Sequence, residues 1–177
     1  SYAIRKLGAA TGVVVTASHN PPAYNGYKAY WNDGAQIIEP HDVGIIERVN
    51  AVTTIRSMPK EEALAKGLLV MIDKNIDDQY IAMVKSHLFR PALFKAMAKD
   101  VKIVYTPLHG TGAMPFERVM GELGLSVVTV PEQKAPNGDF PTVAYPNPEE
   151  AAALKMALDL GAKVKADVVM ATDPDAD

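Results

Sequence analysis

The sequence contains no cysteine, which excludes a disulfide framework and a thiolate metal site and fits a reducing cytoplasm. No apolar run approaches the roughly 20 residues of a membrane-spanning helix, so no membrane partner is expected. There is no basic excess either. The formal net charge is -3, whereas a nucleic-acid or anionic-membrane partner would need a basic face. These absences leave room for a small anionic ligand in a cytoplasmic protein, because such a ligand needs only local positive groups.

The N-terminus also lacks the charged region, apolar region and cleavage site of a signal peptide, and no methionine stands at position 1. We therefore expect the chain to begin inside a longer protein. Its 177 residues, 48% hydrophobic and 22% charged, allow one soluble globular domain or two small ones. An irregular stretch before Asn75 predicts a boundary there, with domains at 1–75 and 76–177.

Strand and helix patterns alternate along the chain. Strands are expected where β-branched runs meet turn residues, over 12–16, 27–31, 101–106, 126–130 and 167–172. Helices are expected where apolar residues recur at helical spacing, over 42–52, 77–89, 115–123 and 147–160. The βαβαβ order of the second half predicts a mostly parallel sheet with helices on its faces. The predicted fold class is α/β: two consecutive α/β domains with mixed, mostly parallel sheets flanked by helices.

Three details of these elements can be tested. The strand over 12–16 is expected to be buried, because Val13 to Val15 form a β-branched run. Asn147 is expected to be the N-cap of the last helix, with a proline and two acids in its first turn. Gly124 and Gly161 are expected to end the last two helices.

Ser18 lies in a proline-bounded loop, TASHNP at 16–21, directly after the first predicted strand. A serine in such a loop is expected to face solvent. The adjacent His19 suggests a hydrolase, but nucleophile and base are seldom sequence neighbours, and the Gly-x-Ser-x-Gly elbow is absent. From these residues alone, a structural turn at the strand end stays an alternative.

Three carboxylates alternate after the last predicted strand, at Asp173, Asp175 and Asp177. Charges a few ångströms apart repel by roughly 1–4 kcal/mol per pair, so a positive partner is expected. Oxygen ligands at alternate positions suit a hard cation such as Mg²⁺. The run does not fit an EF-hand, which follows a helix and needs glycine at its sixth position. A solvated acidic segment and a Ca²⁺-binding structural protein stay alternatives.

Two further segments carry weaker signals. Lys28, in NGYK at 25–28, could neutralise charge or act as a general acid or base near Ser18. The turn HGTG at 109–112 precedes a predicted helix and is either an anion site or a tight strand–helix turn. It does not match the P-loop pattern.

Taken together, three runs resemble the α-D-phosphohexomutase superfamily, the phosphoglucomutase and phosphomannomutase enzymes. They are TASHNP at 16–21, NGYK at 25–28 and DPDAD at 173–177, in the family's order. TPLHGTG at 106–112 and PNPE at 146–149 are most similar to the phosphoglucomutase branch that includes phosphopentomutases. The resemblance spans essentially the whole chain and favours a phosphate-carrying serine over a structural turn.

The resemblance implies a role for each matching residue. Ser18 would be a catalytic phosphoserine, and its phosphate would complete a site for one Mg²⁺ with Asp173, Asp175 and Asp177. The implied reaction moves phosphate between the 1- and 6-positions of a hexose phosphate, with glucose as the expected sugar. A sugar 1,6-bisphosphate would be the intermediate and activator. Phosphomannomutase and phosphopentomutase activities are the alternatives.

The other matching residues lie around the serine. Lys28 would be a general acid or base, His19 a further catalytic residue, and Asn20 part of the phosphate environment. The family places an arginine directly after the acidic triplet, where this sequence ends. Of the family's four domains, the chain would cover most of the first and the second. We therefore expect an N-terminal fragment that alone does not turn over glucose 1-phosphate. A non-catalytic module that binds metal or phosphate is the competing hypothesis.

Overall fold

A computed structural model describes residues 1–177, which form two compact units. One unit holds Ser1–Val14 and Tyr27–Tyr80, and the other holds Val15–Gly26 and Ile81–Asp177. The loop that carries Ser18 therefore belongs to the second unit, although in the sequence it lies between β1 and β2. No helix is long and apolar enough to cross a membrane.

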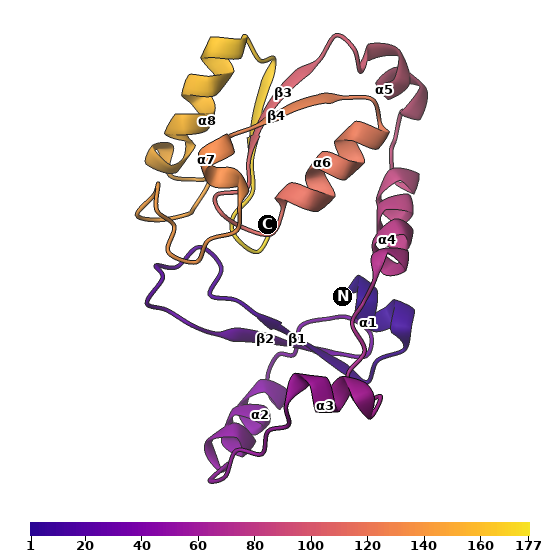
Figure 1. Ribbon diagram of the computed structural model, residues 1–177, viewed down its shortest axis with the longest axis vertical. Helices are drawn as coiled ribbons and strands as arrows, with labels where there is room; N and C mark the ends of the chain where they lie inside the picture. The colour runs from indigo at the N-terminus through magenta and orange to yellow at the C-terminus, as the bar shows by residue number, and fades with distance from the viewer. The chain divides into compact units, whose positions relative to one another are not determined.

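The first unit combines a two-stranded sheet with short helices, drawn in indigo to magenta in Figure 1. Its elements are α1 (Tyr2–Leu7), β1 (Thr11–Val15), β2 (Tyr27–Trp31), α2 (His41–Asn50), α3 (Lys60–Ala65) and the first half of α4 (Lys74–Ser86). The strands over 12–16 and 27–31 and the helices over 42–52 and 77–89 are confirmed to within a few residues. Helices α1 and α3 were not expected, because six residues are too few to display a helical period.

The prediction that the first strand is buried is wrong. Val13 is 59% exposed and Val15 is 77% exposed. A sheet of two strands offers few neighbours for a β-branched side chain. At Gly12 the strand is covered by Ile4 of α1, which is buried and lies where a Cβ of Gly12 would be.

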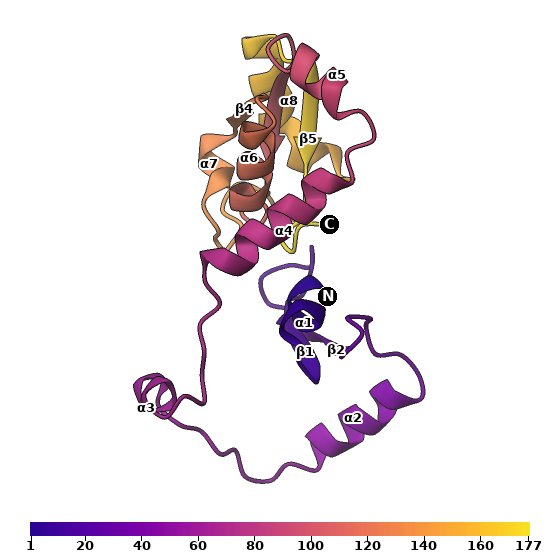
Figure 2. The ribbon, with the colours of Figure 1, turned by 90° about the vertical axis from the view of Figure 1, so that its right-hand side faces the viewer.

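The second unit is built on a three-stranded parallel sheet of order β4-β3-β5, as predicted. Its elements are the rest of α4, α5 (Pro91–Met97), β3 (Lys102–Thr106), α6 (Ala113–Glu122), β4 (Ser126–Thr129), α7 (Pro131–Lys134), α8 (Ala151–Val164) and β5 (Val168–Ala171). Figure 2 shows β4 and β5 at the two sides of this sheet. Helix α5 was not expected. Pro91 occupies its first turn, where a proline is well tolerated.

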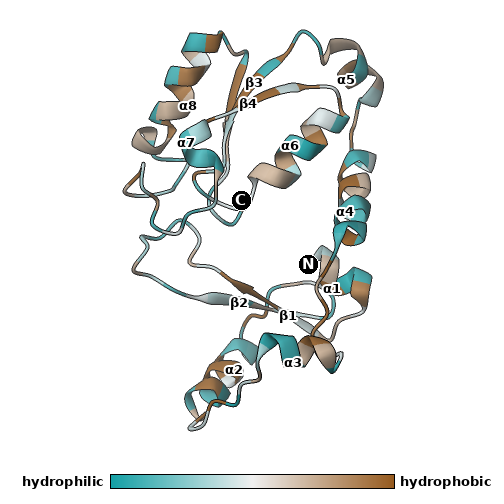
Figure 3. Cartoon of the chain, in the orientation of Figure 1, coloured by the Kyte–Doolittle hydropathy of each residue, from teal (hydrophilic) through white to brown (hydrophobic).

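Helices lie on both faces of the sheet. Because successive residues of a strand point to opposite faces, neighbouring residues of β3 contact different helices. Val104 packs with Val130 and with Ala157 of α8. Tyr105, the next residue, stacks on Phe116 of α6 with ring centroids 3.9 Å apart. Figure 1 accordingly shows α8 and α6 on opposite sides of the strands. In Figure 3, β3 and β4 are largely hydrophobic, as strands of a parallel sheet with helices on both faces should be.

Helix α8 differs from the prediction at both ends. It begins at Ala151 rather than after Asn147, whose carbonyl accepts the Glu150 N–H at 3.0 Å in a preceding turn. It also continues through Gly161 to Val164. A Cβ at Gly161 would lie 2.7 Å from Val169 Cγ2, so this glycine allows α8 to approach β5 closely. The prediction for Gly124 is confirmed, since it follows α6 with a φ of 81°.

Candidate active site

Two polar loops meet in the second unit, the loop around Ser18 and the acidic loop of residues 173–177. Ser18 Oγ donates a hydrogen bond to Asp173 Oδ2 at 2.8 Å and lies 3.3 Å from Asp175 Oδ1. Thr16 Oγ1 donates to Asp175 Oδ2 at 3.2 Å. The structure therefore brings the predicted nucleophile and two of the predicted metal ligands into direct contact.

Ser18 is held in this position by a tight turn. Its φ of 52° places a non-glycine residue in the left-handed region, which is uncommon and marks a locally constrained backbone. The Ser18 N–H donates to Thr16 Oγ1 at 2.8 Å. Asn20 closes the turn, because its backbone N–H and its Nδ2 donate to the Ala17 carbonyl at 3.1 and 2.8 Å. Asn20 thus shapes the loop that presents Ser18.

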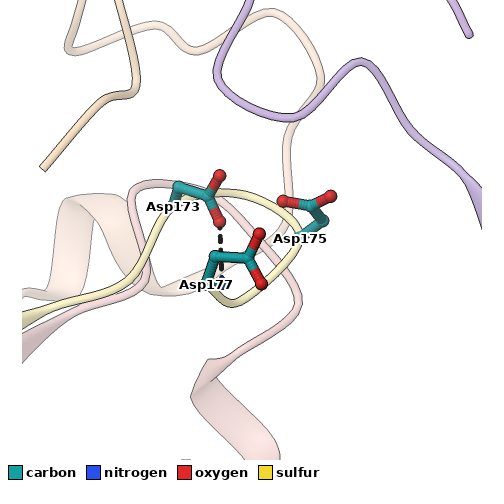
Figure 4. Close-up of side chains that lie close together, drawn as sticks. All are labelled: Asp173, Asp175 and Asp177. Carbon is teal, nitrogen blue, oxygen red and sulfur yellow. Dashed lines mark hydrogen bonds between the residues drawn. The ribbon is translucent and has the colours of Figure 1, made fainter. Parts of the chain in front are cut away.

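The acidic loop is also tightly closed. Asp173 is 4% exposed, and its Oδ1 accepts the Asp177 N–H at 2.9 Å. In return, the Asp173 N–H donates to the Asp177 carbonyl at 3.2 Å. Figure 4 shows the three carboxylates gathered around this turn, with the bond from Asp177 to Asp173 dashed. One oxygen from each carboxylate lies within 4.8 Å of the others, so the cluster could hold a metal ion.

The chemistry of these donors fits a hard divalent cation. Oxygens on opposite sides of an octahedral Mg²⁺ would be about 4.2 Å apart, and around Ca²⁺ about 4.8 Å, from the usual metal–oxygen distances. The observed spread of up to 4.8 Å is of this size. The available donors are three carboxylates and the Ser18 hydroxyl. Oxygen donors of this kind are typical of Mg²⁺ and Ca²⁺ sites, whereas Zn²⁺ sites usually include imidazole or thiolate ligands.

His19 lies beside the two groups that meet at the site. Its Nδ1 is 3.4 Å from Ser18 Oγ and 3.7 Å from Asp173 Oδ2. The His19 side chain is 49% exposed, against 5% for Asp173, so solvent reaches it. Lys28 lies in β2 of the first unit, where it is half-buried, and its catalytic role stays a prediction.

The turn at 107–112 is tight and contacts the acidic loop, which the sequence did not reveal. The Gly110 N–H donates to the Pro107 carbonyl at 2.8 Å, and the Thr111 N–H donates to the Pro174 carbonyl at 3.0 Å. With both donors in use, the structure favours the tight-turn interpretation over the anion site. The sequence feature that could have predicted this contact is the pair Gly110 and Gly112, since glycine permits close backbone approach.

Tyr105 supports the acidic loop from the sheet. Its hydroxyl is hydrogen-bonded to Thr172 Oγ1 at 2.7 Å, on the residue before Asp173. Burial raises the pKa of Tyr105 above its ordinary value, and the hydrogen bond to Thr172 offsets only part of this increase. Tyr105 therefore stays a neutral hydrogen-bonding group across the physiological range.

An open hollow of about 430 Å³ lies next to Ser18. Its lining comes from four segments of the second unit: the loop around Ser18, the turn at 109–111, the loop at 136–140 and Pro174 of the acidic loop. The lining includes polar side chains such as Asn20 and Asn137 and aromatic ones such as Tyr24 and Phe140. The hollow is large enough to admit a small ligand beside the serine.

Together, the parallel α/β/α layers and a serine joined to a carboxylate cluster define an α/β protein with a candidate cation site beside a serine. Comparisons with known proteins identify its family. Residues 78–177 match phosphoglucomutase/phosphomannomutase, alpha/beta/alpha domain II, and residues 1–56 match alpha/beta/alpha domain I of the same family. The chain therefore belongs to the phosphoglucomutase/phosphomannomutase family, which confirms the resemblance and the α/β fold class.

Individual relatives agree with this assignment. A Schizosaccharomyces pombe protein named "Probable phosphoribomutase" is 43% identical over 99% of this chain and 30% of its own length. A Mus musculus phosphopentomutase is 39% identical over 99% of this chain and 29% of its own. The solved structure of a phosphoglucomutase/phosphomannomutase family protein from Burkholderia thailandensis shares the fold, with a TM-score of 0.67 at 24% identity over 93% of this chain and 31% of that one. The chain thus spans about 30% of the length of these curated relatives.

Proposed function

We propose that the chain carries the phosphate-donating part of a phosphosugar mutase, with Ser18 as the phosphorylated residue. The observation that carries the proposal is the hydrogen bond from Ser18 Oγ to Asp173 Oδ2 at 2.8 Å, inside a cluster of three carboxylates. A hydroxyl surrounded by carboxylates is a poor place for a bare phosphate, because the negative charges repel. With a divalent cation present, the same arrangement becomes a phosphate site.

The proposed reaction has two half-steps. In the first, the bond between phosphorus and Ser18 Oγ breaks as phosphorus bonds to a free hydroxyl oxygen of the sugar phosphate. The hydroxyl proton passes to a base, and Ser18 Oγ regains a proton. In the second, the resulting sugar bisphosphate donates its other phosphate back to Ser18 Oγ by the same exchange in reverse. The sugar leaves with its phosphate moved, and the serine is phosphorylated as at the start.

Phosphoryl transfer depends on positioning and charge neutralisation more than on an activated nucleophile. The turn around Ser18 supplies the positioning, because its backbone is fixed by the Thr16 and Ala17 contacts. Asp173, Asp175 and Asp177 would hold Mg²⁺, which supplies charge neutralisation at the phosphate oxygens. The donor set accepts Ca²⁺ as well, so Mg²⁺ is proposed for its better match to phosphate chemistry.

We assign the proton transfers to the basic residues of the two predicted segments. Lys28 is proposed as the general acid or base that exchanges a proton with the sugar hydroxyl. His19 is proposed as a group beside the serine phosphate, supported by its 3.4 Å approach to Ser18 Oγ. Asn20 is proposed to fix the loop conformation in the phosphate environment, through its two bonds to Ala17.

Two sugar classes are proposed as substrates. A hexose phosphate, with glucose first, follows from the family's activity, and a Staphylococcus saprophyticus phosphoglucomutase is 35% identical over the whole chain. A pentose phosphate is the second candidate. It is favoured by the names of the relatives at 43% and 39% identity, a phosphoribomutase and a phosphopentomutase.

Transfer from two defined donors tests the function and the sugar class together. The full chain is incubated with Mg²⁺ and labelled glucose 1,6-bisphosphate or ribose 1,5-bisphosphate, and label retained on the protein is counted. We expect up to one phosphate per chain, with the faster donor identifying the sugar class. Ser18→Ala should abolish the label, whereas Ser57→Ala, at an exposed serine of the first unit, should not. Equal labelling of Ser18→Ala and the unsubstituted chain would contradict the proposal.

A further inference from the structure

The turn of residues 107–112 lies against the backbone of the acidic loop. The Thr111 N–H and Oγ1 both donate to the Pro174 carbonyl, at 3.0 and 3.3 Å. Gly110 lies so close to Pro174 that a Cβ would be 2.5 Å from its carbonyl oxygen and 2.7 Å from its carbonyl carbon. Real Cβ atoms essentially never approach this closely, so only glycine fits at 110 without a shift of the acidic loop.

The obstacle at Gly110 is backbone rather than side chain. Pro174 stands between Asp173 and Asp175, and a displacement of its main chain moves both neighbouring carboxylates. Gly110 has no left-handed φ, unlike Gly124 at 81°, so alanine is compatible with its own backbone conformation. The requirement for glycine therefore comes from the contact with the acidic loop alone.

The conformation of the turn is itself stabilised by hydrogen bonds to neighbouring residues. Leu108 and His109 have φ values of 46° and 63°, which is a costly conformation for two successive non-glycine residues. It is maintained by hydrogen bonds from the Leu108 N–H to Thr106 Oγ1 at 3.1 Å and from the His109 N–H to the Gln133 carbonyl at 3.0 Å. Leu108 is fully buried and His109 is 4% exposed.

A side-chain network that is buried at Thr106, His109 and Gln133 and ends at the exposed Thr142 holds the same residues. Thr106 Oγ1 donates to Gln133 Oε1 at 2.7 Å, and Gln133 Nε2 donates to Thr142 Oγ1 at 3.0 Å. His109 Nε2 completes the chain with a 2.9 Å hydrogen bond to Thr142 Oγ1. Its three buried members favour one conformation, because a buried side chain left without its hydrogen-bond partner would carry the full desolvation penalty. The turn is thus held in one conformation and contacts the acidic loop at Pro174.

We propose that this turn sets the spacing of the three carboxylates and so the cation affinity of the site, with Gly110 and Thr111 as its positioning residues. The inference rests on the proposed function, because the spacing matters only if the carboxylates hold a cation. Neither residue belongs to the proposed ligand set. Their effect is exerted through Pro174, in the way that outer-shell residues orient metal ligands.

A pair of glycine substitutions tests the proposal. Mn²⁺ binding to the full chain is measured by electron paramagnetic resonance, with far-UV circular dichroism as a check on folding. Gly110→Ala should weaken Mn²⁺ binding by about 10- to 100-fold, the usual effect of changing an outer-shell partner. Gly138→Ala is the matched control, because nothing lies within 4 Å of its Cβ position although it lines the same hollow. Its Mn²⁺ affinity should equal that of the unsubstituted chain.

A second pair covers the case in which Gly110→Ala does not fold. Thr111→Val removes the hydroxyl that donates to Pro174 and should weaken Mn²⁺ binding roughly threefold, as loss of one hydrogen bond predicts. Thr111→Ser keeps the donor and should restore the affinity. If the unsubstituted chain binds Mn²⁺ and the folded variants bind it equally well, the positioning role is wrong. If the unsubstituted chain binds no Mn²⁺, the proposed function itself fails.

Discussion

Replacement of Asp173 by asparagine tests whether the acidic loop is electrostatically strained without a cation. Asp173 is 4% exposed, and its carboxylate lies within 4.8 Å of those of Asp175 and Asp177. Two unit charges at this separation repel by about 1 kcal/mol in water and about 3.5 kcal/mol at an effective dielectric of 20. Asparagine has nearly the same shape and removes both repulsions at once.

The substitution also weakens two hydrogen bonds. Ser18 Oγ and the Asp177 N–H would lose a charged acceptor, at about 1 kcal/mol each. With about 2 kcal/mol of repulsion per pair at this partly exposed site, we expect a net stabilisation of about 2 kcal/mol. For a chain of this length, that raises the thermal midpoint by about 4–8 °C.

With Mg²⁺ bound, the unsubstituted chain should become more stable than Asp173→Asn. At 100 times its dissociation constant, a ligand stabilises the folded chain by about 2.7 kcal/mol. The unsubstituted chain should therefore gain about 5–11 °C from Mg²⁺, whereas Asp173→Asn should gain little.

The assay is thermal unfolding followed by circular dichroism, with EDTA and with saturating Mg²⁺. Asp159→Asn is the control, because this acid is paired with Lys155 on the surface of α8 and its loss should change stability by less than about 1 kcal/mol. The electrostatic reasoning would be refuted if Asp173→Asn were less stable than the unsubstituted chain in EDTA and if Mg²⁺ raised the thermal midpoint of both proteins equally.

Two further predictions concern the sheet that carries the site. Gly161→Ala should destabilise the chain by about 1–3 kcal/mol, because its Cβ would overlap Val169 on β5, whereas Gly121→Ala, in open space on α6, should stabilise it by about 0.5–1 kcal/mol. Urea unfolding measures both, and a stabilising Gly161→Ala would show that α8 can move away from the sheet. Because the pKa of Tyr105 is raised, stability should be complete below pH 10 and fall as the pH rises beyond it. Tyr105→Phe should remove its part of this alkaline loss, and an ultraviolet titration that shows every tyrosine ionising at its ordinary pKa would contradict the burial effect.

The sequence predicted the second unit better than the first. The strands β3, β4 and β5 are β-branched runs between turn residues, and the central strand β3 is buried as that pattern predicts, whereas β4 and β5 at the edges are only partly covered. The run at β1 looks the same in sequence but is exposed, because burial depends on how many strands and helices surround it. The end of α8 was misplaced for a related reason: Gly161 serves a contact with β5, which no local pattern records.

The candidate site was predictable to the extent that it uses strand ends. Ser18 and the acidic residues follow strands, and the resemblance placed them together before the structure showed the 2.8 Å contact with Asp173. The support from Gly110 and Thr111 was not predictable, because it depends on a backbone approach between segments far apart in the sequence. The role of Lys28 stays a prediction.

The central claim is that Ser18 carries phosphate, and phosphopeptide mapping tests it most directly. The full chain is incubated with glucose 1,6-bisphosphate and Mg²⁺, digested, and analysed by tandem mass spectrometry. The account predicts that the peptide containing Ser18 gains the mass of one phosphate, located by fragmentation at Ser18, and that EDTA prevents the gain. Phosphate at another residue, or none on the Ser18 peptide while phosphate is retained by the chain, would contradict it.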